Sequence, residues 1–180
     1  ARDAQGAARA FVAEFGLADI EHYFDSGGSV PGSLGAAGVP HTYYFAATHK
    51  ANRGAAQAAY ISPMRDAIDA GLHPTNHTDF YVAPMDQMFM MWSAVNRVSR
   101  EGEVVGPDQR ITPMEALKSQ TIWAAEQYGE EGRRGSLEPG KIADLVILDR
   151  NPLTVEPMQI KDVKVLETMK EGKTIWKRAP

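Results

Sequence analysis

The side chains best suited to chemistry on a polar substrate are five histidines and an aspartate close to the last of them. The histidines lie within the first 77 residues, at His22, His41, His49, His73 and His77. Neutral imidazole is a frequent ligand for zinc and similar metals, so this clustering raises the question of a metal site. The sequence contains no HxH pair, and spacing alone leaves ordinary surface or core roles open for each histidine.

The aspartate is Asp79, which follows the polar segment 75–78 and precedes the apolar segment 80–82. We expect a strand over 73–82 that passes into a loop. A carboxylate at the point where a strand leaves its sheet lies at the carboxyl-terminal rim, where the active sites of barrels are found. The same pattern is typical of an Asx-turn or a helix N-cap, and the residues alone leave these alternatives open.

Composition narrows the classes of partner. The chain has 180 residues and a net charge of −4, and its lysines and arginines form no basic stripe, which argues against nucleic acid and anionic membranes. No apolar run approaches the roughly 20 residues that span a bilayer. The absence of cysteine excludes disulfides, thiolate nucleophiles and cysteine-bound metals. Cytoplasmic and periplasmic locations both stay open. Ala1 stands within a helix-like pattern, so we expect a leader or domain upstream.

The first half of the chain alternates predicted helices and strands, which favours a parallel sheet or barrel. Aromatic and β-branched residues predict a strand over His41–Phe45. Ala46–Ala59 is expected to be an ordered loop, and Ser62 is expected to cap a helix that ends before Gly71. The remaining expected elements are a helix over 3–15, a strand over 17–24 that carries His22, a loop over 26–38 and a helix over 84–100.

The second half has different local signals. Thr112 to Glu115 is a capping box that opens a helix through about Gln127. Residues 142–148 predict a buried strand, and 163–169 with 173–177 predict a hairpin. Gly140 is expected at positive φ. We expect Asp144 to bind the turn at 137–141 or Lys141, in a structural role.

Several segments together resemble the C-terminal portion of the metal-dependent amidohydrolase superfamily, in its amidohydrolase-3-like branch. The resemblance runs from about Ala59 to Lys177, and Ile20 to His22 is similar to the sixth-strand segment that carries a metal-binding histidine. The segments that carry it are 76–84, 92–97, 111–117, 135–149 and 164–173.

The resemblance implies an α/β fold, the C-terminal portion of a (β/α)8 TIM-type barrel followed by strands of a small β-sandwich. Residues 1–128 would form the partial barrel, with about strands 6–8, and residues 129–180 the sandwich portion. His22 and Asp79 would bind a divalent metal, with zinc expected, and Asp79 would also shuttle the proton. His41 and His77 would contact substrate. Because the first-strand HxH is absent, a missing N-terminal barrel portion or a second chain would complete the site.

The implied function is metal-dependent hydrolysis of a non-peptide C–N bond, in a small-molecule amide or cyclic amide, as part of a larger amidohydrolase. Nucleic acid and membranes are not expected as partners. A different class stays open, in which the chain is a truncated, non-catalytic remnant or an interaction module that pairs with another chain. An isomerase or deiminase on the same scaffold is a third alternative.

Overall fold

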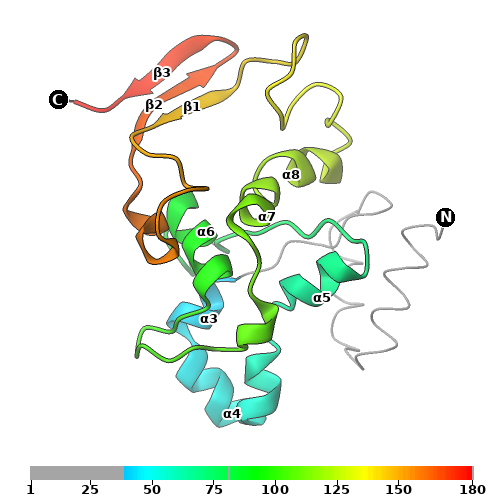
Figure 1. The fold of residues 1–180 in the computed structure, drawn as a ribbon, viewed down its shortest axis with the longest axis vertical. Coiled ribbons are helices and arrows are strands. Elements are labelled where there is room, and N and C mark those ends of the chain that lie inside the picture. Colours follow the sequence, from blue (N-terminus) through cyan, green and yellow to red (C-terminus); the bar gives the residue numbers. More distant parts are fainter. Residues whose placement is uncertain (1–38, 81, 180) are drawn as a thin grey trace.

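The computed structural model describes residues 39–80 and 82–179. Figure 1 shows the three-stranded sheet at one end of the long axis and α4 at the other, with the remaining helices between them. The expected elements over 3–15, 17–24 and 26–38, and therefore His22, lie outside the described residues. The elements are α3 (Pro40–Tyr44), α4 (Ala46–Ala59), α5 (Met64–Asp69), α6 (Gln87–Asn96), η1 (Pro107–Gln109), α7 (Pro113–Lys118), α8 (Ile122–Gln127), β1 (Leu145–Leu148), η2 (Pro157–Asp162), β2 (Val165–Lys170) and β3 (Lys173–Lys177).

Helix α6 is the centre of the hydrophobic core. Asp86 caps its first turn, because the carboxylate accepts a hydrogen bond from the Phe89 amide at 2.9 Å. The predicted shared face of Met88, Trp92 and Val95 is buried. This face packs against residues from four other segments of the chain, which are Val39, Met64, Ile111, Ile160 and Val163. The helix is shorter than the expected 84–100, since its backbone turns left-handed at Arg97, with φ 51°.

Arg97 is completely buried and acts as a clamp on the backbone. Its Nε donates to the carbonyl of Val105 at 2.7 Å, and its two Nη atoms donate to Ser62 at 3.0 Å and Ile61 at 2.6 Å. A longer contact of 3.4 Å reaches the carbonyl of Ala59. Among the ion pairs of the described residues, none involves Arg97. Burial, and secondarily Arg110, lowers the pKa of Arg97 to about 10. The clamp joins the end of α4 and the start of α5 to the end of α6.

The first described segment is helical, so the expected strand over His41–Phe45 is wrong. Pro40 stands in the first turn of α3, where its fixed φ favours a helix. The expected loop at Ala46–Ala59 is also wrong, because this segment is α4. Its many alanines have the highest helix propensity, and the irregularity is confined to Gly54, at φ 79° and ψ 163°. Hydrogen bonds of 2.9 Å from Phe45 to His41 and from His49 to Phe45 run through the junction of the two helices.

Two expectations around α5 are corrected. The helix exists, but Ser62 does not cap it, since Ser62 is left-handed with φ 51° and Pro63 takes the N-cap position without a side-chain hydrogen bond. Among the described residues 73–80 and 82, no regular strand forms. This segment crosses toward α7 and α8 instead, where the Asn76 amide donates to the Ser119 carbonyl at 3.4 Å.

The capping box at the start of α7 is confirmed, with Thr112 and Glu115 bonded in both directions. The single helix expected through Gln127 is interrupted, and α7 and α8 are separate. The hydroxyls of Ser119 and Thr121 each donate at 2.8 Å to the carbonyls of Ala116 and Leu117. Such hydroxyls compete with the amides of a continuing helix for the same carbonyls. None of the helices in the described ranges is long and apolar enough to cross a membrane.

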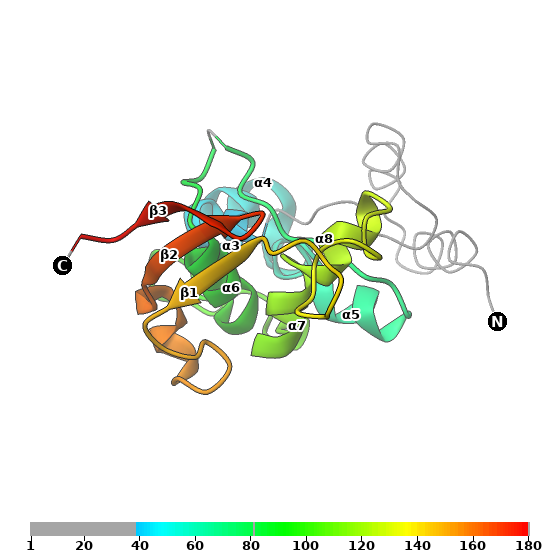
Figure 2. The same ribbon diagram turned by 90° about the horizontal axis from the view of Figure 1, so that it is seen from above.

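The sheet has the order β1-β2-β3 and is antiparallel throughout. The predicted hairpin is confirmed. The strand expected as buried over 142–148 is shorter and partly open, since Val146 is 56% and Ile147 46% exposed. Only Leu148 of this strand packs against the core, and Figure 2 shows the sheet from above with β1 along one edge. Among the described residues no strand pairs with the outer edge of β1, and an apolar edge strand with exposed side chains favours pairing with another strand.

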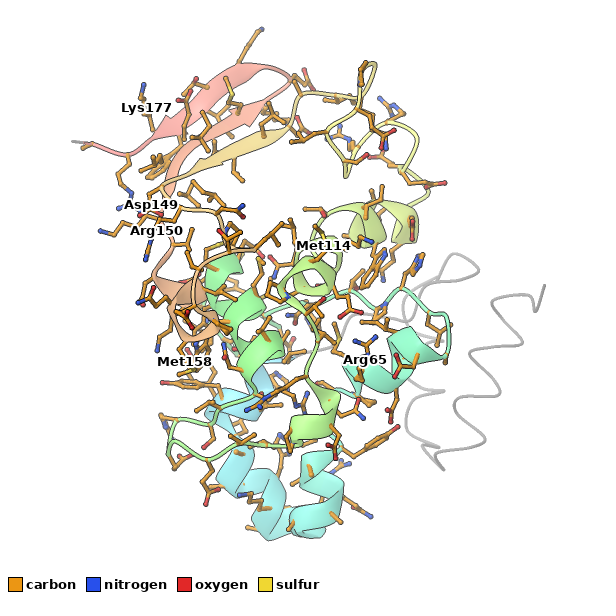
Figure 3. All side chains as sticks on the ribbon, in the orientation of Figure 1. Arg65, Met114, Asp149, Arg150, Met158 and Lys177 are labelled. Carbon is orange, nitrogen blue, oxygen red and sulfur yellow. The ribbon has the colours of Figure 1, made fainter. Side chains whose placement is uncertain are left out.

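The loop before β1 is joined to the hairpin by Asp144. Gly140 has φ 93°, as predicted. Asp144 does not bind the 137–141 turn or Lys141. Its carboxylate pairs with Arg134 and accepts the Glu171 amide at 2.9 Å, because the β2–β3 turn folds back over it. At the other end of β1, Asp149 accepts the amide of Lys164 at 2.8 Å and Arg150 donates to the carbonyl of Asp162 (Figure 3).

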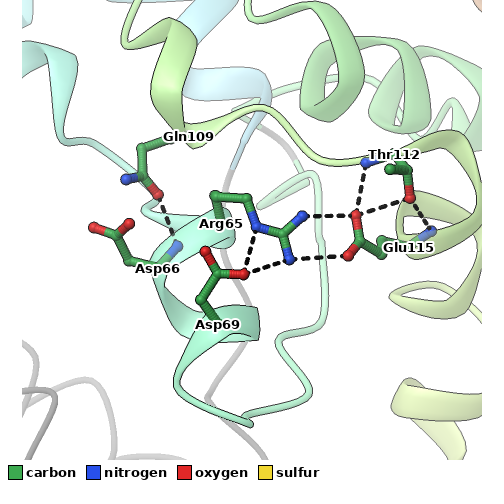
Figure 4. A network of polar contacts seen from close by, with 6 residues as sticks. All are labelled: Arg65, Asp66, Asp69, Gln109, Thr112 and Glu115. Atoms are coloured by element: carbon green, nitrogen blue, oxygen red, sulfur yellow. Dashed lines mark hydrogen bonds and ion pairs between the residues drawn. The ribbon is translucent and has the colours of Figure 1, made fainter.

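Ion pairs fasten α5 to α7. Both Nη atoms of Arg65 donate to the carboxylate of Glu115, at 2.9 Å each, while Arg65 also contacts Asp69 (Figure 4). Burial alone would raise the pKa of Glu115, but hydrogen bonds from Arg65 and Thr112 outweigh it and lower that pKa. The same carboxylate therefore serves the capping box and the contact between helices.

Candidate functional site

Asp79 sits in a tight turn whose geometry is set by its neighbours. Its backbone is left-handed, with φ 52°, a conformation that aspartate tolerates better than most residues. The Asp79 amide donates to Nδ1 of His77 at 3.1 Å, and its carbonyl accepts the amide of Val82 at 2.6 Å. Because Nδ1 of His77 accepts, the proton of the neutral ring lies on Nε2. The carboxylate itself is 53% exposed and accessible from solvent.

His41 reaches this carboxylate from α3. Its Nε2 lies 3.7 Å from Oδ2 of Asp79, and the imidazole is 27% exposed. This distance is too long for a direct hydrogen bond, and it allows attraction between charges only when the imidazole is protonated. The structure thus brings His41, His77 and Asp79 together from segments far apart in the sequence.

Burial keeps the histidines of this site neutral near pH 7. It is the largest cause of the lowered pKa of His41, where attraction to Asp79 opposes the effect and His77 adds to it. Burial also lowers the pKa of His77, again opposed by Asp79. A neutral imidazole offers one N–H donor and one acceptor, so these rings can hydrogen bond to a substrate.

His49, which was not among the predicted site residues, lies near His41. Burial, followed by repulsion from His41 and Arg53, lowers its pKa. The rings of His41 and His49 both lie edge-on to Phe45, with centroid distances of 5.5 Å and 6.4 Å. The spacing 41, 45, 49 is the signal that could have revealed this helical face, but the expectation of a strand and a loop concealed it.

The histidine and aspartate side chains of this site are of the types that bind zinc, but the described residues supply too few of them to complete a zinc site. Imidazole nitrogen and carboxylate oxygen are usual zinc ligands, and four ligands complete a tetrahedral site. Among the described residues no group of three or more histidine, aspartate or glutamate side chains could hold a metal ion. Asp79 is thus at most part of such a site.

Comparison with known proteins places the chain in a larger context. An N-substituted formamide deformylase of Arthrobacter pascens is 33% identical over 118 residues, which is 66% of this chain and 22% of that protein. An uncharacterized metal-dependent hydrolase from Pyrococcus horikoshii matches in structure with TM-score 0.53 and 28% identity, over 66% of this chain and 24% of that one. A Xaa-Pro dipeptidase matches with TM-score 0.55 and 20% identity, over 97% and 43%.

The chain therefore spans about a fifth of the length of two curated relatives that it matches. The model of the amidohydrolase family matches residues 28–176, which is most of the sequence. This match covers α3 to β3, with the turn at Asp79, the capped helix α7 and the terminal hairpin. The chain belongs to the amidohydrolase family.

Proposed function

We propose that the chain is the C-terminal part of an amidohydrolase that hydrolyses the C–N bond of a small, non-peptide amide. The observation that carries this proposal is the half-exposed carboxylate of Asp79, held 3.7 Å from Nε2 of His41 in a turn fixed by His77. Membership of the amidohydrolase family supports the reaction class. The deformylase of Arthrobacter pascens is named for N-substituted formamides, so this class of amide is the first substrate to test.

In this proposal Asp79 carries the proton. Its carboxylate accepts a proton from the attacking water and returns it to the leaving nitrogen, as a general base and then a general acid. His41 and His77 orient the substrate, because a neutral imidazole can donate its N–H to the carbonyl oxygen of an amide. The open side of Asp79 gives substrate and water access to the carboxylate.

We also propose a divalent metal, with zinc as our expectation and His22 and Asp79 as its ligands in this chain. A bound divalent ion would lower the pKa of a coordinated water and polarise the carbonyl. The name of the Pyrococcus horikoshii protein as a metal-dependent hydrolase supports this proposal. A solved adenosine deaminase with bound zinc shares the fold, with TM-score 0.50. Residues 1–128 would be the barrel portion and residues 129–180 the sandwich portion.

The remaining ligands would come from the missing N-terminal barrel portion or from a second chain. Support comes from the coverage of the relatives and from the open edge of β1, where Val146 and Ile147 are exposed. We call the chain together with this polypeptide the complete enzyme.

The substitution Asp79→Asn in the complete enzyme tests the proposal. Asparagine tolerates the left-handed conformation and preserves shape, but it cannot carry the proton. We expect kcat for formate release from an N-substituted formamide to fall about 10³-fold, with the melting temperature unchanged. Asp69→Asn, on the exposed side of α5, is the control and should retain full activity. An Asp79→Asn enzyme with the rate of the unmodified protein would remove Asp79 from the mechanism.

A second candidate function is that of a non-catalytic module that pairs with another chain. The shortage of metal donors among the described residues favours it for the chain alone. Equilibrium dialysis of the 180-residue chain against zinc separates the two functions. Stoichiometric zinc that is lost in the Asp79→Asn variant contradicts the non-catalytic module. Absence of bound zinc in the complete enzyme contradicts the metal-dependent hydrolase.

A further inference from the structure

One face of α3 and α4 carries His41, Phe45 and His49 at successive intervals of four residues. The hydrogen bonds from Phe45 to His41 and from His49 to Phe45 keep the helical repeat through the junction of the two helices. Residues four apart lie above one another on a helix, so these rings form a single row. The contacts of Phe45 with both imidazoles confirm that the rings adjoin. His49 is therefore placed in the same row as a residue of the Asp79 site.

The two imidazoles each contain a buried nitrogen without a hydrogen-bond partner among the described residues. Nε2 of His41 and Nε2 of His49 are both shielded from solvent, and neither finds a hydrogen-bond partner among the described residues. Buried polar atoms in proteins nearly always have such a partner, and exceptions cluster where a ligand or ordered water completes the bonding. A bound ligand can supply the missing partner of both nitrogens.

The geometry points to His49 as a second substrate-contacting imidazole of this site, which binds the amide group of the substrate through Nε2. This inference rests on the proposed function and adds a residue to it. An amide presents one oxygen acceptor and, in most cases, one N–H donor. Neighbouring neutral imidazoles can match both, since each ring has one donor and one acceptor. Burial lowers the pKa of His49, which supports a neutral ring. The chemical class of ligand is thus a small carboxamide, bound through its carbonyl oxygen and its N–H group.

Two substitutions in the complete enzyme separate a substrate contact from a packing role. His49→Leu removes the polar atom but fills the space, whereas His49→Gln restores an amide N–H near the position of Nε2. If His49 contacts substrate, the leucine variant loses about 100-fold in kcat/KM for an N-substituted formamide, as is usual for one lost donor, and the glutamine variant regains part of it. If His49 only packs, the leucine variant is at least as stable and fully active. His73→Gln is the matched control, because His73 stacks on Trp123 and pairs with Glu126 away from this row.

A second measurement does not depend on turnover. In the Asp79→Asn enzyme, the ¹⁵N resonance of Nε2 of His49 should shift when an N-substituted formamide is added, while that of His73 should stay in place. An unshifted His49, together with a fully active His49→Leu enzyme, would overturn the inference and leave the proposed function intact. An active Asp79→Asn enzyme would instead refute the proposed function, whatever His49 does.

Discussion

Replacing Arg97 by methionine should destabilise the protein more than any other single change in the loops around α6. Methionine has a similar length and no charge, so it fills the space but donates no hydrogen bond. The carbonyls of Ile61, Ser62 and Val105 would each lose a partner at 2.6 to 3.0 Å. Since the guanidinium is fully buried, water cannot replace it without opening the structure.

The magnitude follows from opposing contributions. A hydrogen bond from a charged group contributes about 1.5–3 kcal/mol, and an unsatisfied buried acceptor costs about 1–3 kcal/mol. Removing the buried charge relieves a desolvation penalty of several kcal/mol, which is also why the pKa of Arg97 is low. We expect a net loss of about 3–5 kcal/mol for Arg97→Met. Arg97→Lys keeps the charge but cannot reach all of these carbonyls, so its loss should be about half as large.

Urea denaturation, followed by tryptophan fluorescence, measures these changes, because Trp92 and Trp123 are both buried. The exposed Arg133 on the surface loop is the matched control, and Arg133→Met should shift the free energy of unfolding by less than about 0.5 kcal/mol. An Arg97→Met protein within 1 kcal/mol of the unmodified one would show that the clamp is not a major source of stability. A loss for Arg97→Lys as large as for Arg97→Met would show that geometry matters more than charge.

Two further predictions concern ionisable groups. Three histidines have a pKa below 6.5 in the folded protein, so they resist protonation that the unfolded chain accepts. The free energy of unfolding should therefore fall as the pH drops below 6.5, and it should stop falling once the pH is below their folded pKa values. Urea titrations between about pH 5 and 8 should lose this slope when all three are changed to glutamine. These histidines are His41, His49 and His77. Glu115→Gln breaks the bidentate pair with Arg65 and half of the capping box, so the free energy of unfolding measured in urea should fall by about 2–3 kcal/mol. Asp69→Asn, on the exposed side of the same arginine, is the control and should lower it by at most about 0.5 kcal/mol. Equal losses for the two variants would contradict this account.

Elements encoded by neighbouring residues could be predicted from the sequence. The capping box at Thr112 and the β2–β3 hairpin depend on contacts within a few residues, and both are confirmed. The strand predicted for His41–Phe45 is wrong, because its aromatic and β-branched residues favour a strand on propensity alone. Tertiary packing decides otherwise, since Tyr43 lies edge-on to Phe89 and Trp92 of α6.

The candidate site shows the same division. His77 and Asp79 are two residues apart, so their hydrogen bond is a local feature of the turn. The approach of His41 to Asp79 joins distant segments, and only the resemblance to a family pointed to it. The position of His49 in the same row as His41 was not predicted, because a segment interpreted as a loop has no helical face. The exposed side chains of β1 were expected to be buried, because a nearly continuous apolar run favours a buried strand. Burial depends on what packs against the sheet, and neighbouring residues do not encode that.

The contacts of Arg97 also bear on how this region can vary between related proteins. The clamp binds only main-chain carbonyls, and these exist whatever side chain the residue carries. Exchanges of side chain at Ile61 or Val105 therefore leave its hydrogen bonds in place. An inserted or deleted residue between α4 and α5 would move those carbonyls out of reach. Gly106 adds to this restriction, because a Cβ there would lie 1.8 Å from the carbonyl oxygen of Ala59. In the loops around Arg97, the length of the loop is therefore more restricted than the identity of its side chains.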